Sequence, residues 1–206
     1  MARVELVKPD QIDDPMIQAI FAWVTQMESA VPNHFYLELN FPEFMKAKLG
    51  ATKVLWEAGE LTMEEIQHIG IAVSRANGCP YCTAAFCTIL NYGLGKEENY
   101  VRRFVSEGAA ATEDERTATI VRFAEKANAD PAAIDDGDVE GLRKIGLTDK
   151  GVVQLVHLVS DFAAYNRLNI ALGTDYDYRD MWREIAFGWQ PGAGDAPGDN
   201  TRGLPT

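Results

Sequence analysis

The spacing of apolar residues along the chain predicts helices nearly throughout. Between residues 15 and 30 apolar side chains recur every three or four positions, which is the period of a helix with one buried face. The same pattern returns in a segment that starts at Thr62 and in residues 42–59, 113–128, 135–145, 148–172 and 177–187. No segment sustains the period-two alternation of a half-buried strand. The pattern therefore predicts an all-α protein.

A predicted helix break precedes two closely spaced cysteines. Asn77-Gly78 favours the end of a helix, because both residues tolerate left-handed backbone. Pro80 suits the first position of the next helix. Cys79 and Cys82 then share a first turn with their sulfurs on one side, where unpaired amides and the helix dipole stabilise a thiolate. These features indicate a reversible dithiol–disulfide pair.

Composition narrows the classes of protein that fit. Of 206 residues, 47% are apolar and 24% are charged, which is ordinary for a soluble globular protein. The net charge of −12 argues against nucleic acid or an anionic membrane as partner. No run approaches the roughly 18 apolar residues of a membrane span, and the N-terminus lacks a secretory signal. Three cysteines make no disulfide framework, so we expect a reducing cytoplasm.

Zinc binding is the main alternative use of the two thiols. Structural zinc sites usually pair one CxxC with a second couple of ligands, and the chain offers none. Cys87 lies five residues after Cys82 and is rotated off its face of the helix, so we interpret it as a small core residue. A thioredoxin-like site is disfavoured because that motif follows a strand. We therefore do not expect zinc at these thiols.

A short internal repeat relates the two halves of the chain. Its matching positions, 86 residues apart, are Leu61-Thr62, Ile66 and Val73-Ser74 with Leu147-Thr148, Val152 and Val159-Ser160. We predict two helix-pair units, about 41–95 and 133–175, within one helical domain of residues 1–189. Residues 190–206 are rich in Gly, Pro and Asp, which predicts a flexible tail.

The dithiol could reduce peroxides if one thiolate attacks and the other resolves the sulfenic acid. Such a reaction needs a proton donor or acceptor nearby. Glu64 is one candidate. His157 is another, because the helix that carries it is expected to pack against the first repeat helix.

Other side chains in the predicted helices have structural interpretations. Arg167 falls within a helix expected to be mostly buried, so we expect it to pair with Glu64 or Glu65. Several aromatic residues have the helical spacing of core positions, which favours core over pocket lining, namely Trp56, Phe86, Phe162 and Tyr165.

The segment around the cysteines resembles a known superfamily. Residues 72–85, with the sequence AVSRANGCPYCTAA, look like the core of the carboxymuconolactone decarboxylase and alkylhydroperoxidase D superfamily, and more narrowly its two-repeat peroxidase-related branch. The segments 32–35 (PNHF), 41–44 (FPEF) and 166–169 (NRLN) fit that branch, and the likeness covers roughly residues 15–180. It implies an all-helical fold, assembly into dimers, trimers or hexamers, and thiol peroxidase activity without metal or organic cofactor.

The resemblance also implies roles for the thiols, with Cys82 attacking the peroxide and Cys79 resolving. Two family positions differ here. The residue four after Cys82 is Phe86 instead of histidine, and the residue twelve before Cys79 is Gln67 instead of glutamate. Neither side chain can relay a proton.

We therefore expect a slow peroxidase that reduces a small hydroperoxide with a thiol or a reductant protein, its protons relayed by Glu64, His157 or water. The alternative is a non-peroxidase helical oligomer of the same superfamily with a redox-sensing or structural CxxC. Decarboxylase chemistry is disfavoured, because those members act without a redox dithiol.

Overall fold

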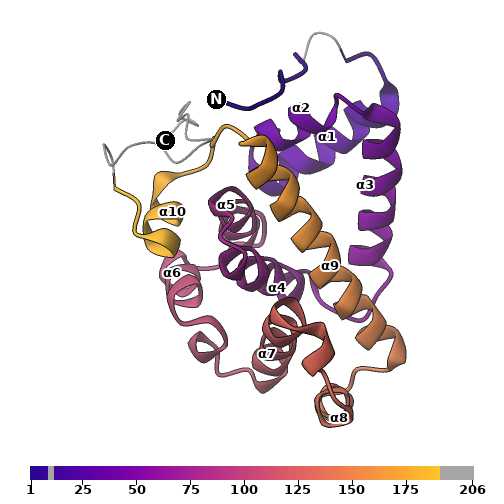
Figure 1. The fold of residues 1–206 in the computed structure, drawn as a ribbon, viewed down its shortest axis with the longest axis vertical. Coiled ribbons are helices and arrows are strands. Elements are labelled where there is room, and N and C mark those ends of the chain that lie inside the picture. The colour runs from indigo at the N-terminus through magenta and orange to yellow at the C-terminus, as the bar shows by residue number, and fades with distance from the viewer. Residues whose placement is uncertain (9–11, 191–206) are drawn as a thin grey trace.

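The chain folds into helices that pack around a central pair. A computed structural model describes residues 1–8 and 12–190 (Figure 1). Helices α4 (Met63–Ala76) and α5 (Pro80–Thr88) lie at the centre, and α9 (Asp149–Leu172) packs against both. The described residues contain no strand, so the all-α prediction is confirmed. Of the predicted tail, residues 191–206 lie outside the described part of the chain.

The other helices surround this centre, with α6 and α10 on one side and α3 on the other in Figure 1. They are α1 (Pro15–Glu28), α2 (Asn33–Glu38), α3 (Pro42–Glu57), α6 (Glu98–Glu107), α7 (Glu115–Ala129), α8 (Asp136–Lys144) and α10 (Asp180–Phe187). The sequence pattern did not predict α2 and α6. Helix α2 has only six residues, whereas α6 has an apolar face of Val101, Phe104 and Val105 from which it could have been predicted. No helix in the described ranges is long and apolar enough to cross a bilayer.

Helices α4 and α9 begin at the two threonines that the internal repeat aligns. Thr62 and Glu65 form a capping box, in which each side chain accepts a hydrogen bond from the backbone N–H of the other, at 3.1 and 2.7 Å. Thr148 caps α9 by accepting from the N–H of Lys150. The two helices pack against each other, as expected for paired units, while their origin as a repeat stays a prediction.

Arg116 on α7 ties these two helix starts together. Its Nε donates to Glu65 Oε1 at 2.7 Å, and its Nη1 and Nη2 donate to the carbonyl oxygens of Ile145 and Glu60. Glu65 is buried, so its carboxylate needs such a partner. The ion pair predicted for Arg167 is wrong, because that side chain lies on the exposed face of α9.

Two hydrophobic clusters form the interior. The larger one surrounds α4, α5 and α9. The smaller one lies among α1, α2 and α3 and consists of Ile17, Val24, Phe35, Leu39, Met45 and Leu49. Contacts of α1 with α5 and of α3 with α9 join the two clusters. The first three helices therefore cover one side of the central pair.

Replacement of the arginine that joins the helix starts tests its structural role. We expect Arg116→Met to lower the free energy of unfolding by about 2 kcal/mol, because it leaves the buried Glu65 carboxylate without its charged partner. The matched control, Arg122→Met, removes an exposed pair with Glu115 and should cost less than about 1 kcal/mol. Urea unfolding followed by circular dichroism measures both, and equal losses would contradict the assignment.

Candidate thiol site

The two cysteines lie where α5 begins. Helix α4 ends at Asn77, and Gly78 turns the chain with φ of +67°, a conformation that favours glycine. Cys79 is the N-cap of α5 instead of a residue of its first turn, and its Sγ accepts a hydrogen bond from the N–H of Cys82 at 3.4 Å. Both thiols are buried and free. Across residues 1–8 and 12–190, no three His, Cys, Asp or Glu side chains are grouped to hold a metal ion.

Asn169 on α9 is the polar partner of Cys82. Its Nδ2 donates to Cys82 Sγ at 3.2 Å. Its Oδ1 accepts from the Thr174 hydroxyl at 2.7 Å and lies 3.2 Å from Nδ1 of His34. Since the hydroxyl donor binds the oxygen end of the amide, the N–H end faces the sulfur.

The surroundings of the two sulfurs favour a thiolate on Cys82. Burial by itself raises the pKa of Cys82, but hydrogen bonds from Cys79, Asn166 and Asn169 and the Lys48 ammonium lower it, so the pKa lies below its usual value. The hydrogen bond to Cys82 and burial raise the pKa of Cys79. Of the two thiols, Cys82 is therefore the one that loses its proton more readily, and Cys79 holds its proton more firmly.

A chain of amides fixes the turn before Cys79 to the neighbouring helices. Asn166 Nδ2 donates to the Ser74 hydroxyl, and Asn77 Nδ2 donates to Asn166 Oδ1, both at 2.9 Å. Asn77 and Asn128 exchange hydrogen bonds through their side chains. The end of α4 is thus bound to α9 and α7, which holds the thiols in register with Asn166 and Asn169.

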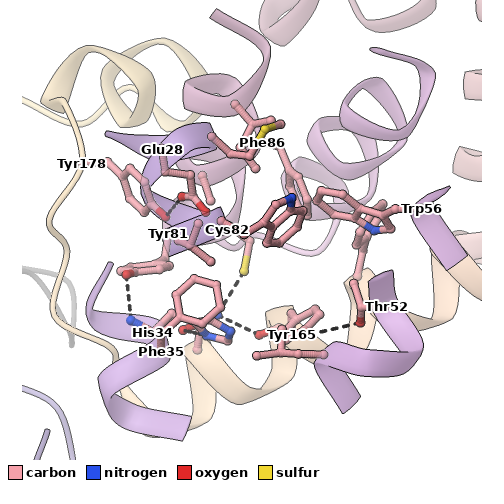
Figure 2. A pocket seen from close by; sticks show the side chains of 18 residues that line it. Glu28, His34, Phe35, Thr52, Trp56, Tyr81, Cys82, Phe86, Tyr165 and Tyr178 are labelled. Atoms are coloured by element: carbon pink, nitrogen blue, oxygen red, sulfur yellow. Dashed lines mark hydrogen bonds between the residues drawn. The ribbon is translucent and has the colours of Figure 1, made fainter. Parts of the chain in front are cut away.

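A cavity of about 80 Å³ adjoins Cys82 where the two hydrophobic clusters meet. Its walls are mostly apolar, and Figure 2 shows aromatic rings on several sides of it. The four aromatic residues interpreted as core are all buried and also line this cavity, namely Trp56, Phe86, Phe162 and Tyr165. These four aromatic side chains therefore belong to the hydrophobic core and to the cavity wall at the same time.

Neither family relay position offers a titratable group. The ring of Phe86 packs directly over Gly70, where a Cβ would lie 2.5 Å from the ring, and against Phe162. Gln67 is fully buried, and its Nε2 donates to the Met63 carbonyl at 3.2 Å. Both positions contribute packing.

The structure does not bring Glu64 or His157 to the thiols. Glu64 lies in the first turn of α4, at the end remote from Cys79, and pairs with Lys96 at 2.8 Å. His157 is exposed on the outer face of α9, beside a surface groove. The predicted packing of α9 on α4 is correct, but the turn of the helix directs Leu155 and Leu158 inward in place of His157.

Two other titratable residues, Glu28 and His34, line the cavity instead. Burial lowers the pKa of His34 to about 4, so this imidazole is neutral near pH 7. Burial raises the pKa of Glu28 to about 8, although the Tyr178 hydroxyl donates to its Oε2 at 2.5 Å and opposes the rise. A signal for Glu28 existed in the sequence, because it continues the buried stripe of Ile17 and Val24 on α1.

Comparisons with known proteins agree with this fold. Residues 42–126 match the model of the carboxymuconolactone decarboxylase family, and no curated protein matches. A peroxidase-related protein from Ralstonia eutropha JMP134, described as an alkylhydroperoxidase AhpD core, is 23% identical with a TM-score of 0.75, covering 90% of this chain and 96% of its own. A peroxidase-related protein from Silicibacter sp. TM1040 is 22% identical with a TM-score of 0.73, covering 88% and 93%.

A third similar structure is the debrominase Bmp8, at 20% identity and a TM-score of 0.71, covering 88% of this chain and 94% of its own. A cysteine-to-alanine variant of that enzyme is also known in complex with 2,3,4-tribromopyrrole. These likenesses extend over nearly the whole of each chain and establish a shared fold. The family match and the shared fold confirm the predicted resemblance: residues 42–126 resemble the carboxymuconolactone decarboxylase family, and the chain has an alkylhydroperoxidase D-like helical fold.

Proposed function

We propose that the chain is a thiol-dependent peroxidase in which Cys82 attacks a small hydroperoxide and Cys79 resolves the product. The observation that carries this proposal is the hydrogen bond from Asn169 to Cys82 Sγ beside an apolar cavity. This hydrogen bond holds the Cys82 sulfur beside a cavity that a small molecule can enter. The Cys79 thiol lies next to Cys82 and accepts a hydrogen bond from its backbone N–H.

The reaction divides into three balanced steps. The Cys82 thiolate bonds to the terminal peroxide oxygen while the O–O bond breaks, which leaves an alkoxide that takes up a proton and a sulfenic acid on Cys82. The Cys79 sulfur then displaces the sulfenic hydroxyl, which leaves as water with the Cys79 proton, and a disulfide forms. An external thiol or reductant protein restores both thiols and is itself oxidised.

The cavity walls favour an organic hydroperoxide over hydrogen peroxide. An alkyl or aryl group that enters loses contact with water against rings such as Trp56 and Phe162, and burial is worth about 25 cal/mol for each Å² of apolar surface. Hydrogen peroxide gains nothing from these walls, so the proposal includes a higher kcat/KM for organic substrates.

Serine substitutions at the cysteines test the proposed roles. We expect Cys82→Ser to reduce peroxide consumption with dithiothreitol to background, because the attacking sulfur is gone. Cys79→Ser should still form one sulfenic acid, which dimedone traps and mass spectrometry detects. Cys87→Ser is the matched control and should keep full activity, because burial raises the pKa of this thiol and it lines no part of the cavity. Unchanged activity of Cys82→Ser would contradict the proposal.

The amide that faces the sulfur gives a second prediction. Asn169→Ala removes a donor to the Cys82 thiolate, so the pKa of Cys82 should rise and peroxide oxidation below neutral pH should slow about tenfold. Ultraviolet absorbance of the thiolate during a pH titration measures the first effect, and stopped-flow kinetics measure the second. Asn91→Ala is the control, because the Asn91 amide donates a hydrogen bond to the Lys96 carbonyl oxygen and does not line the cavity. A thiolate titration unchanged by Asn169→Ala would refute this role.

The aromatic cavity favours a second candidate function, thiol-dependent removal of bromine from an aromatic ring. The likeness to the debrominase Bmp8 supports it. In such a reaction the ring exchanges bromine for hydrogen, bromine leaves as bromide, and two thiols become a disulfide. Bromide release from 2,3,4-tribromopyrrole in the presence of dithiothreitol tests it, with Cys82→Ser as control. No release above that control would eliminate this candidate.

A further inference from the structure

We propose that Glu28 is a catalytic acid, whose carboxyl group gives its proton to the oxygen that leaves when Cys82 attacks a hydroperoxide. This assignment rests on the proposed peroxidase function and supplies the proton donor that Gln67 and Phe86 do not provide. Glu28 is the last residue of α1 and lies outside the segment that matches the family model.

The geometry places the carboxyl group and the sulfur on one cavity. Glu28 and Cys82 both line it, and Figure 2 shows them on neighbouring parts of its wall. The hydroxyl of Tyr178 donates to Oε2 of Glu28 at 2.5 Å. Within the described residues, nothing donates a hydrogen bond to the other oxygen, Oε1. One carboxyl oxygen is therefore anchored, and the other is available to carry a proton to a substrate.

The surroundings keep this carboxyl group protonated. Burial raises its pKa to about 8, and the negative charges of Asp177 and Cys82 oppose its ionisation further. The titratable groups that face it are Tyr178 and Asp177 from the connection between α9 and α10, Tyr81 and Cys82 from α5, and His34 from α2. Near pH 7 Glu28 is thus a protonated acid beside Cys82, the more readily ionised of the two thiols.

Other proton donors in the cavity fit the role less well. His34 has a pKa of about 4, so it carries no extra proton near pH 7, and its Nδ1 lies against Asn169. Burial raises the pKa of Tyr81 and of Tyr178 well above the usual value, so both hold their protons more firmly than a carboxylic acid does. A general acid works best when its pKa is close to the working pH.

The proton transfer completes the first step of the reaction. As the bond from Cys82 sulfur to oxygen forms, the electron pair of the O–O bond moves to the leaving oxygen, which takes the proton from Glu28 and departs as an alcohol. Glu28 becomes a carboxylate and regains a proton from water before the next cycle. Leaving groups that are already stable as anions do not need this proton.

The experiment compares a leaving group that needs a proton with one that does not. Glu28→Gln keeps the size of the side chain and an acceptor oxygen for Tyr178 but has no acidic proton. We expect single-turnover oxidation of Cys82 by tert-butyl hydroperoxide to slow about 100-fold, while oxidation by peracetic acid, whose leaving group is acetate, changes less than about threefold. Glu125→Gln, at a half-buried carboxyl group beside a separate groove, is the matched control and should leave both rates unchanged.

The pH profile gives a second readout that a merely structural role would not move. With tert-butyl hydroperoxide the wild-type rate should fall above about pH 8, because Glu28 loses its proton there, and this fall should be absent in Glu28→Gln. Tyr178→Phe removes a hydrogen bond that lowers the pKa of Glu28, so the fall should move to higher pH. This variant keeps the test decisive if Glu28→Gln does not fold.

The outcomes separate this assignment from the proposed function. Equal slowing of both oxidants in Glu28→Gln, or no slowing of either, would overturn the assignment while Cys82 peroxidase activity stands. A Tyr178→Phe variant that folds and shows an unmoved profile would also overturn it. If neither oxidant converts Cys82 in the wild-type chain, the peroxidase function fails and the role of Glu28 fails with it.

Discussion

The proposed function requires a sulfur that carries negative charge inside an apolar interior, and this requirement is the constraint on which the site depends. Burial opposes ionisation of Cys82, and the opposing contributions come from three directions: the thiol of Cys79 before it, the amides of Asn166 and Asn169 on α9, and the ammonium of Lys48 on α3. Each is short-ranged, so α3, α5 and α9 must keep their relative positions. The tertiary structure, more than any single group, sets the reactivity of the thiol.

The relative position of α4 and α9 is fixed at both ends of α4. At one end, the threonine caps and Arg116 hold the starts of α4 and α9. At the other end, the chain of amides through Asn77 binds the turn before Cys79 to α9. Between Thr148 and Asn169 helix α9 rises about 30 Å. This one helix therefore connects the capped helix starts with the amide that binds Cys82.

Local signals in the sequence were enough to predict most of the helices, α2 and α6 excepted, and the thiol pair, because caps, the Asn-Gly break and the CPYC segment act within a few residues. The titratable groups that line the cavity were not predictable in the same way. The prediction for His157 came from the pairing of α4 with α9, and that pairing is correct. Each residue turns a helix by about 100°, however, and this rotation directs His157 to solvent. Glu28 and His34 reach the cavity beside Cys82 only through tertiary packing.

The cavity takes part of its wall from helices that give no hydrogen bond to the Cys82 sulfur. The Cys79 thiol, the amides on α9 and Lys48 on α3 lower the pKa of Cys82, while α1 and α2 contribute apolar walls such as Val24 and Phe35 from the smaller hydrophobic cluster. Substitutions at these two wall residues therefore reshape the space in front of Cys82 and leave the hydrogen bonds to its sulfur in place. For the proposed peroxidase, such wall positions can change the range of substrates while Cys82 and Glu28 are retained.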